Sequence, residues 1–240
     1  MMVTIPVVAH RLFGTRVRRE VADPAPERAI VSVGPRQVTH LPGLWSSELY
    51  APTTVWITEI DRSHGTRRTT DEIAAFFAPD PALAYTRGTT VNDIWSPLGV
   101  EFRLVETVEH AIDNDLADMM SQDTRVYYPL AERLGRRNAV NLFLVRALVG
   151  AIGRSGGVYA ARDRYPAYAF LSDIHDLSLD FFRWQYDNVV LAHEFGHLFG
   201  LPHMPDARNL MQPAAGVGAT AVTLTQRRII EARAPGFPTI

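Results

Sequence analysis

The sequence contains no cysteine, no long apolar run and almost no net charge. Without cysteine the chain can form neither a disulfide nor a thiol-based latency switch, so its stability cannot come from covalent cross-links between cysteines. No apolar stretch approaches the ~18 residues that cross a bilayer, and we therefore expect no membrane span. A net charge of −2 offers no electrostatic attraction to nucleic acid or to an anionic membrane.

Length and composition favour a globular protein. The 240 residues, 47% of them hydrophobic, suffice for one sizeable domain or for one domain with an N-terminal appendage. We divide the chain into residues 1–53, an N-terminal extension or pro-like segment, and residues 54–240, the main domain. The start lacks the order of a signal peptide, because a short apolar patch precedes the arginines of residues 11–19 instead of following them.

Residues 193–203 concentrate the chemistry. Positions four apart on a helix project within about 40° of each other and lie about 6 Å apart along its axis. His193 and His197 can therefore direct their imidazoles at one ion, as a zinc site requires. Glu194 lies roughly 100° around the helix from the first histidine. That is a poor position for a ligand and a good one for reaching a water on the metal.

The end of this stretch can supply a third ligand. Gly200 can take a left-handed conformation at a helix end at little steric cost, which lets the chain turn and bring His203 round. Three histidines leave one coordination position open, the mark of a catalytic zinc. The full pattern would arise by chance in roughly 1 of 40,000 chains of this composition. A polar helix end with surface histidines is the alternative, disfavoured because an apolar helix precedes the motif.

The pattern His-Glu-x-x-His-x-x-Gly-x-x-His resembles the motif of the metzincin clan of zinc endopeptidases. Metzincins also carry a methionine in a tight turn beneath the metal, and Met211 in Asn209-Leu210-Met211-Gln212-Pro213 resembles it. On its own, Met211 would be interpreted as a core methionine. Within the clan the matrixin branch comes closest, through this turn and the final helix, although the structural zinc loop of matrixins is absent.

The resemblance implies both a fold and a mechanism. The fold is of the α+β class, a metzincin-like zincin fold with a twisted mixed sheet, an active-site helix and a C-terminal helix below the cleft; residues 54–240 would be its catalytic domain. One Zn²⁺ held by neutral His193, His197 and His203 would lower the pKa of a bound water. Glu194 would take the proton of that water and deliver it to the leaving amine of a cleaved peptide bond.

We assign a short predicted strand, residues 168–171, to substrate binding. Tyr168, Ala169, Phe170 and Leu171 are predicted to lie at the sheet edge beside the cleft, where an extended substrate would add a strand through main-chain hydrogen bonds. Periodicity, capping boxes and turn residues predict the other elements. Strands are expected at residues 3–9, 54–60, 100–108 and 140–149, a glycine-containing loop at 150–157, and helices after Thr69, after Thr90, around Pro129, at 187–199 with Asp187 as N-cap, and after Thr223.

Other polar side chains are interpreted without a catalytic role. Asp173, Asp176 and Asp180 precede the active helix; Ca²⁺ binding is an alternative there, but a solvated acidic loop is favoured because the spacing is irregular. The remaining histidines have no partner at ligand spacing and are interpreted as surface or structural: His10, His40, His64, His110 and His175.

We expect a monomer that acts on protein or peptide substrates. Two other functions stay open. A non-catalytic zinc-binding module on the same scaffold would have no use for Glu194 as a base, and a zinc amidase or aminopeptidase of small substrates would have a blind pocket in place of an open groove. The resemblance implies extracellular action, in contrast to the missing signal-peptide pattern.

Overall fold

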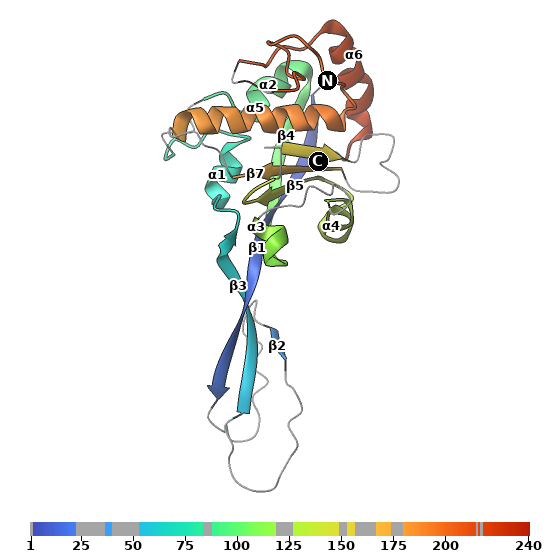
Figure 1. Ribbon diagram of the computed structural model, residues 1–240. Helices are drawn as coiled ribbons and strands as arrows, with labels where there is room; N and C mark the ends of the chain where they lie inside the picture. Colours follow the sequence, from blue (N-terminus) through green and yellow to red (C-terminus); the bar gives the residue numbers. More distant parts are fainter. Residues whose placement is uncertain are drawn as a thin grey trace, which may run out of the picture.

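The longest strand, β1 (Val3–Ala22), organises the molecule. The computed structural model describes residues 2–22, 37–39, 53–83, 88–118, 127–148, 153–156, 167–173, 180–214, 216 and 218–240. These residues form a mixed α/β fold with one twisted, seven-stranded mixed sheet (Figure 1).

The first half of β1 lies in the middle of that sheet. It pairs in parallel with β4 (Val100–Ala111) on one side and with β5 (Val140–Val145) on the other. Beyond β5 follow β7 (Tyr168–Ser172), which is parallel to it, and β6 (Gly153–Gly156), which is antiparallel to β7. In the described part of the chain β6 is therefore the outermost strand on this side.

The second half of β1 leaves the body of the molecule as an arm (Figure 1). From Gly14 onward it pairs antiparallel with β3 (Thr53–Gly65), to which β2 (Gln37–Thr39) is added. A Cβ at Gly14 would lie 2.2 Å from Oδ1 of Asn114 and 2.6 Å from Cβ of His64, so only glycine lets the strand pass this point.

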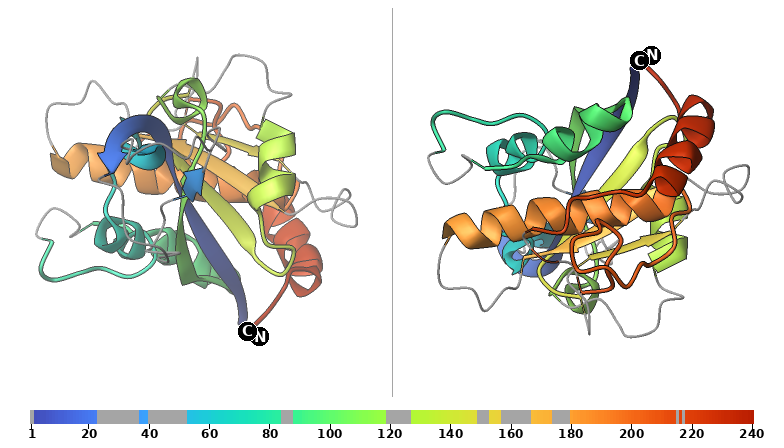
Figure 2. Two further views of the ribbon diagram at one scale, coloured as in Figure 1. Left: turned by 90° about the horizontal axis from the view of Figure 1, so that it is seen from below. Right: turned by 90° about the horizontal axis from the view of Figure 1, so that it is seen from above.

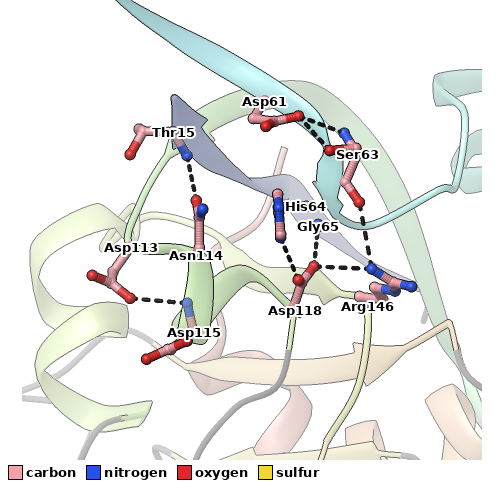
Figure 3. Close-up of polar contacts among 10 residues, drawn as sticks. All are labelled: Thr15, Asp61, Ser63, His64, Gly65, Asp113, Asn114, Asp115, Asp118 and Arg146. Carbon is pink, nitrogen blue, oxygen red and sulfur yellow. Dashed lines mark hydrogen bonds and ion pairs between the residues drawn. The ribbon is translucent and has the colours of Figure 1, made fainter. Parts of the chain in front are cut away.

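Polar contacts hold the base of the arm against the body (Figure 3). The backbone N–H of Thr15 donates to Oδ1 of Asn114 at 2.7 Å, and the Asp118 carboxylate accepts from the backbone N–H of Gly65 at 2.9 Å. The same carboxylate pairs with Nδ1 of His64 and, at 3.4 Å, with Nη1 of Arg146. Both acceptors belong to the short helix α3 (Asn114–Asp118), which thereby joins β1 to β3.

Two apolar layers lie on opposite faces of the sheet, as the alternation of side chains along a strand requires. Val140, Leu142 and Leu144 of β5 belong to the larger core, whereas Phe143 and Val145 belong to the smaller one. The larger core is covered by α1 (Thr70–Ala75), α2 (Val91–Trp95), the 3-10 turn Ser96–Leu98, α5 (Asp180–Leu198) and α6 (Leu224–Arg233), and the smaller by α3 and α4 (Tyr127–Leu134) (Figure 2).

The capping boxes in the sequence correctly predicted where three helices begin. Thr69, Thr90 and Thr223 each form the N-cap of a helix, and each cap is a reciprocal capping box. Three predicted strands are confirmed but extend further than the sequence indicated, to residue 22 in β1, residue 65 in β3 and residue 111 in β4, whereas β5 ends at residue 145 and is shorter than predicted. None of the described helices is long and apolar enough to cross a bilayer.

Several predictions about placement were wrong. Residues 153–156 are strand β6 and not loop, and β7 is not an edge strand, because β5 and β6 flank it on both sides. Asp187 lies inside α5 and is not its N-cap. Within the expected N-terminal segment 1–53, β1 pairs with strands of the main domain, while the assignment of that segment as a separate unit stays a prediction.

Candidate metal centre

The last two turns of α5 carry His193, Glu194 and His197. This part of the helix is buried because its apolar side chains face the larger core; Leu191, Phe195 and Leu198 have no exposed surface. His193 is 4% and Glu194 8% exposed, and His197 is half-buried. The helix therefore holds polar groups in a desolvated position, which it can do only where they have partners.

A glycine turn ends the helix and redirects the chain. Gly200 has φ of 70°, the left-handed conformation that residues with a Cβ avoid. The N–H of Gly200 donates to the carbonyl of His197 at 2.7 Å, and the N–H of Leu201 donates to the carbonyl of Gly196 at 3.1 Å. These two bonds are the pair expected of a Schellman C-cap. The turn brings the exposed His203 back towards the helix.

The turn brings the three predicted histidines together. One ring nitrogen from each of His193, His197 and His203 lies within 4.8 Å of the other two. The ring centroids are 4.7 to 5.3 Å apart, and Nε2 of His197 lies 3.1 Å from Nε2 of His203. Among the described residues no other group of three histidine, aspartate or glutamate side chains meets at one point in this way.

Backbone carbonyls orient two of these rings. Nδ1 of His193 lies 2.7 Å from the carbonyl oxygen of Leu210, and Nδ1 of His197 lies 2.9 Å from that of Leu201. A carbonyl can only accept, so each Nδ1 carries the proton and each Nε2 is left with a lone pair. Metal-binding histidines are commonly held in this way, by a hydrogen bond on the nitrogen that does not face the ion.

Burial keeps the rings neutral. It lowers the pKa of His193 to about 4, against the opposing effect of the Leu210 carbonyl, and it also lowers the pKa of His197. Both imidazoles are therefore uncharged at neutral pH, as a metal ligand has to be. Three imidazole nitrogens form a donor set that suits Zn²⁺ among the common biological cations.

Met211 lies directly beneath the helix. It has no exposed surface, and its Sδ would be only 2.3 Å from a Cβ built on Gly196, so the glycine makes room for the methionine. The backbone N–H of Gln212 donates to the carbonyl of Asn209 at 3.0 Å, which closes the turn, and the N–H of Met204 donates to the carbonyl of Met211 at 2.8 Å. The turn is thus tied both to α5 and to the segment that carries the third histidine.

A buried charge cluster was missed from the sequence. Arg68 is 4% exposed and pairs with Asp187 of α5 at 2.5 Å and with Asp173, at the end of β7, at 3.2 Å. Asp173 also accepts from the hydroxyl of Thr66 at 2.9 Å. The expectation of a solvated acidic loop is therefore wrong for Asp173; Asp176 lies outside the described residues. No sequence signal pairs Arg68 with two aspartates more than 100 positions away.

The strand assigned to substrate has no free edge. All five residues of β7 are buried, and Tyr168, Ala169, Phe170 and Leu171 have partners on both β5 and β6. Of the remaining histidines, His10 and His110 contact each other and His64 pairs with Asp118, in keeping with structural roles. His40 and His175 lie outside the described residues.

No known protein-family model matches this chain, and no curated protein matches it in sequence. Among solved structures its fold is similar to that of metalloproteinase-II from Bacteroides fragilis, with a TM-score of 0.47 and 10% sequence identity. The match covers 95% of this chain and 52% of the other, so this chain spans about half the length of that protein.

Proposed function

We propose that this protein is a zinc-dependent endopeptidase of the metzincin type, with a sequence motif that resembles the matrixin branch. One observation carries the proposal. Three imidazoles offer nitrogens within 4.8 Å of one another, two of them from a helix whose glutamate directly follows the first histidine. A structural zinc site would use four protein ligands and have no use for that carboxylate.

The proposed roles follow from the positions of the side chains. His193, His197 and His203 would hold one Zn²⁺ through their Nε2 atoms. When bound, the ion would supply a Lewis acid that makes its water acidic and polarises a peptide carbonyl. Glu194 would take the proton of the attacking water and return it to the leaving amine. Glu194 is 8% exposed, so this proton transfer would take place largely out of contact with bulk water.

Two residues would support this site without contacting substrate. Gly200 permits the turn that returns His203, since its φ of 70° strains any residue with a side chain. Met211 would form the floor beneath the ligands, because it packs on Gly196 one residue before His197. We also include β1 with residues 54–240 in the proposed catalytic unit, because its first half lies at the centre of the sheet.

An extended substrate would bind along β6 in place of β7. Gly153–Gly156 is the outermost strand on this side of the described sheet, so its outer backbone groups face away from β7. An extended peptide could pair there through main-chain hydrogen bonds. Proline at a donor position of β6 should raise KM, whereas unchanged kinetics would remove this part of the proposal.

Zinc content and cleavage, measured together, test the function. We expect one zinc per chain, internal cleavage of casein or of a peptide library, and a loss of about 10²- to 10⁴-fold in kcat for Glu194→Gln with its zinc retained. If the wild type and Glu194→Gln bind zinc and are equally inert, the protein is a zinc-binding module. If only terminal residues or small amides are cleaved, it is an aminopeptidase or amidase.

A further inference from the structure

Asn209 and Gln226 form a buried amide pair next to the candidate metal centre. Each is 2% exposed. Nδ2 of Asn209 donates to Oε1 of Gln226 at 2.9 Å, and Nε2 of Gln226 donates to Oδ1 of Asn209 at 3.0 Å. The two amides therefore satisfy each other reciprocally, although they lie 17 positions apart in the sequence and on different elements.

Backbone donors on both sides determine which way the amides face. The N–H of Met211 donates to Oδ1 of Asn209 at 2.9 Å, and the N–H of Thr223 donates to Oε1 of Gln226 at 2.8 Å. Gln226 is also the N3 residue of the α6 capping box, so the first turn of that helix holds it in place. The pair is thus anchored at one end in α6 and at the other in the turn of residues 209–212.

That turn contains the carbonyl that orients His193. Leu210 lies between Asn209 and Met211, and its carbonyl oxygen is 2.7 Å from Nδ1 of His193. The N–H of Leu210 is held by the carbonyl of Ala221 at 2.7 Å. The direction of the Leu210 carbonyl is consequently set from both sides, by the strand-like contact to Ala221 and by the bond of Asn209 to the next peptide.

We propose that Asn209 and Gln226 are positioning residues for His193, which act through the Leu210 carbonyl to hold its imidazole in the Nδ1–H tautomer. A pair of apolar side chains could fill the same volume, but it would not determine a direction for the turn, whereas a fully satisfied amide pair does. The proposal rests on the proposed function only where zinc is concerned; the tautomer is a property of the metal-free protein.

The test compares full-length variants. Asn209→Leu, Gln226→Met and the double variant remove the amides with little change of volume. Asn92→Leu is the matched control, because Asn92 also bonds backbone groups of two other segments, at Phe77 and Phe102, and contacts none of the three histidines. Zinc affinity is measured by competition with a chromophoric chelator, and the tautomer of His193 by nitrogen-15 NMR of the metal-free protein.

We expect each single variant to bind zinc about 10- to 100-fold more weakly, the range found when the partner of a metal-binding histidine is lost. The double variant should be no more than about twofold worse than the weaker single, since either change already breaks the pair. The Nδ1–H form of His193 should lose population in the same variants. Asn92→Leu should melt at a lower temperature with zinc affinity and tautomer unchanged.

The proposal is overturned if both single variants keep zinc affinity within about twofold and leave the His193 tautomer unchanged. The pair would then only join α6 to the turn. Should Gln226→Met not fold, Gln226→Glu retains the acceptor for Thr223 and replaces the donor to Asn209 by a carboxylate oxygen that faces Oδ1 of Asn209, with the same expected direction. Should the wild type bind no zinc while the tautomer still responds to these variants, the proposed function fails and the positioning role stands.

Discussion

Two groups of neighbouring imidazoles occur among the described residues, and one of them has the arrangement of a metal site. The triad of His193, His197 and His203 and the pair His10–His110 both place their rings close together, at centroid distances of 4.7 to 5.3 Å and 5.1 Å. Burial lowers the pKa of His10 and that of His193 to about 4 alike. Neither proximity nor burial therefore distinguishes the two groups.

The difference lies in which ring nitrogens are already bonded. Nε2 of His10 lies 3.0 Å from Oδ1 of Asn141, an acceptor, so this nitrogen carries the proton. Nδ1 of His10 then accepts from Nε2 of His110 at 2.8 Å, and both nitrogens of His10 are used inside the protein. In the triad, His193 uses only Nδ1 for the protein and keeps Nε2 for a ligand. His10 is thus held inside the protein at both ring nitrogens, whereas His193 is held at Nδ1, as a metal-binding histidine is.

The largest expected effect is on zinc affinity, when one ring is removed from the triad and, as the control, one from the pair His10–His110. His193→Ala should weaken zinc binding about a hundredfold or more. The binding free energy of a structural zinc with four protein ligands is about 10–16 kcal/mol, so each ligand contributes roughly 3 kcal/mol. His110→Ala should leave zinc affinity unchanged. Chelator competition on both purified variants measures this, and equal losses would show that the comparison is wrong.

Acid should affect the folded state through His10. Its pKa is 6.5 when unfolded and about 4 when folded, mainly because of burial, with the facing His110 and Arg136 adding to the shift. The unfolded chain then binds the proton first, so stability is complete above pH 6.5 and falls by ~3 kcal/mol as the pH drops to about 4. Urea unfolding at several pH values should give a shallower pH dependence for His10→Phe; parallel curves would exclude this role.

A smaller effect is expected beneath the triad. A Cβ at Gly196 would come within 2.3 Å of Sδ of Met211, and overpacking of this kind costs about 1–3 kcal/mol. Gly196→Ala should therefore lower the free energy of unfolding and displace the turn that carries the Leu210 carbonyl. Gly218→Ala is the control, since its Cβ would meet nothing within 4 Å. Similar melting temperatures for the two variants would show that Met211 does not need the space.

The smallest effect concerns the end of α5. Nη1 of Arg233 donates to the carbonyl of Phe199 at 2.5 Å, where a cation is favoured by the helix dipole. Arg233→Met should cost ~1 kcal/mol, which lowers the melting temperature of a protein of this size by about 2–4 °C. Arg228 is exposed and lies in α6, as Arg233 does, and Arg228→Met should leave the melting temperature unchanged. An equal shift in both would assign the effect to charge alone.

Features encoded within a few consecutive residues could be predicted from the sequence. The capping boxes at Thr69, Thr90 and Thr223 need only two side chains three positions apart, and all three are present. The convergence of the three histidines was also predicted, because helix geometry and one glycine turn bring them together within 11 residues of chain. Both depend on short-range geometry that tertiary contacts do not alter.

Features that depend on distant partners could not be predicted. Nothing in Tyr168–Ser172 shows that β6 will pair with its outer side, and Gly153–Gly156, which forms β6, has the composition of a loop. Asp187 resembles an N-cap until Arg68, 119 positions earlier, is placed beside it. Strand pairing and buried ion pairs are decided by the whole fold, so their residues carry no local sign of them.

The arm and the body share one continuous strand. Every residue from Val3 to Ala22 is extended, a length of ~65 Å at about 3.3 Å per residue, and it needs no separate linker at the junction. A force applied at the far end of the ribbon would therefore be transmitted along β1. It would reach the pairing of residues 7–11 of β1 with residues 140–144 of β5. The ribbon is thus joined to the centre of the sheet by one continuous strand, whose pairing with β3 shifts register between Phe13 and Gly14.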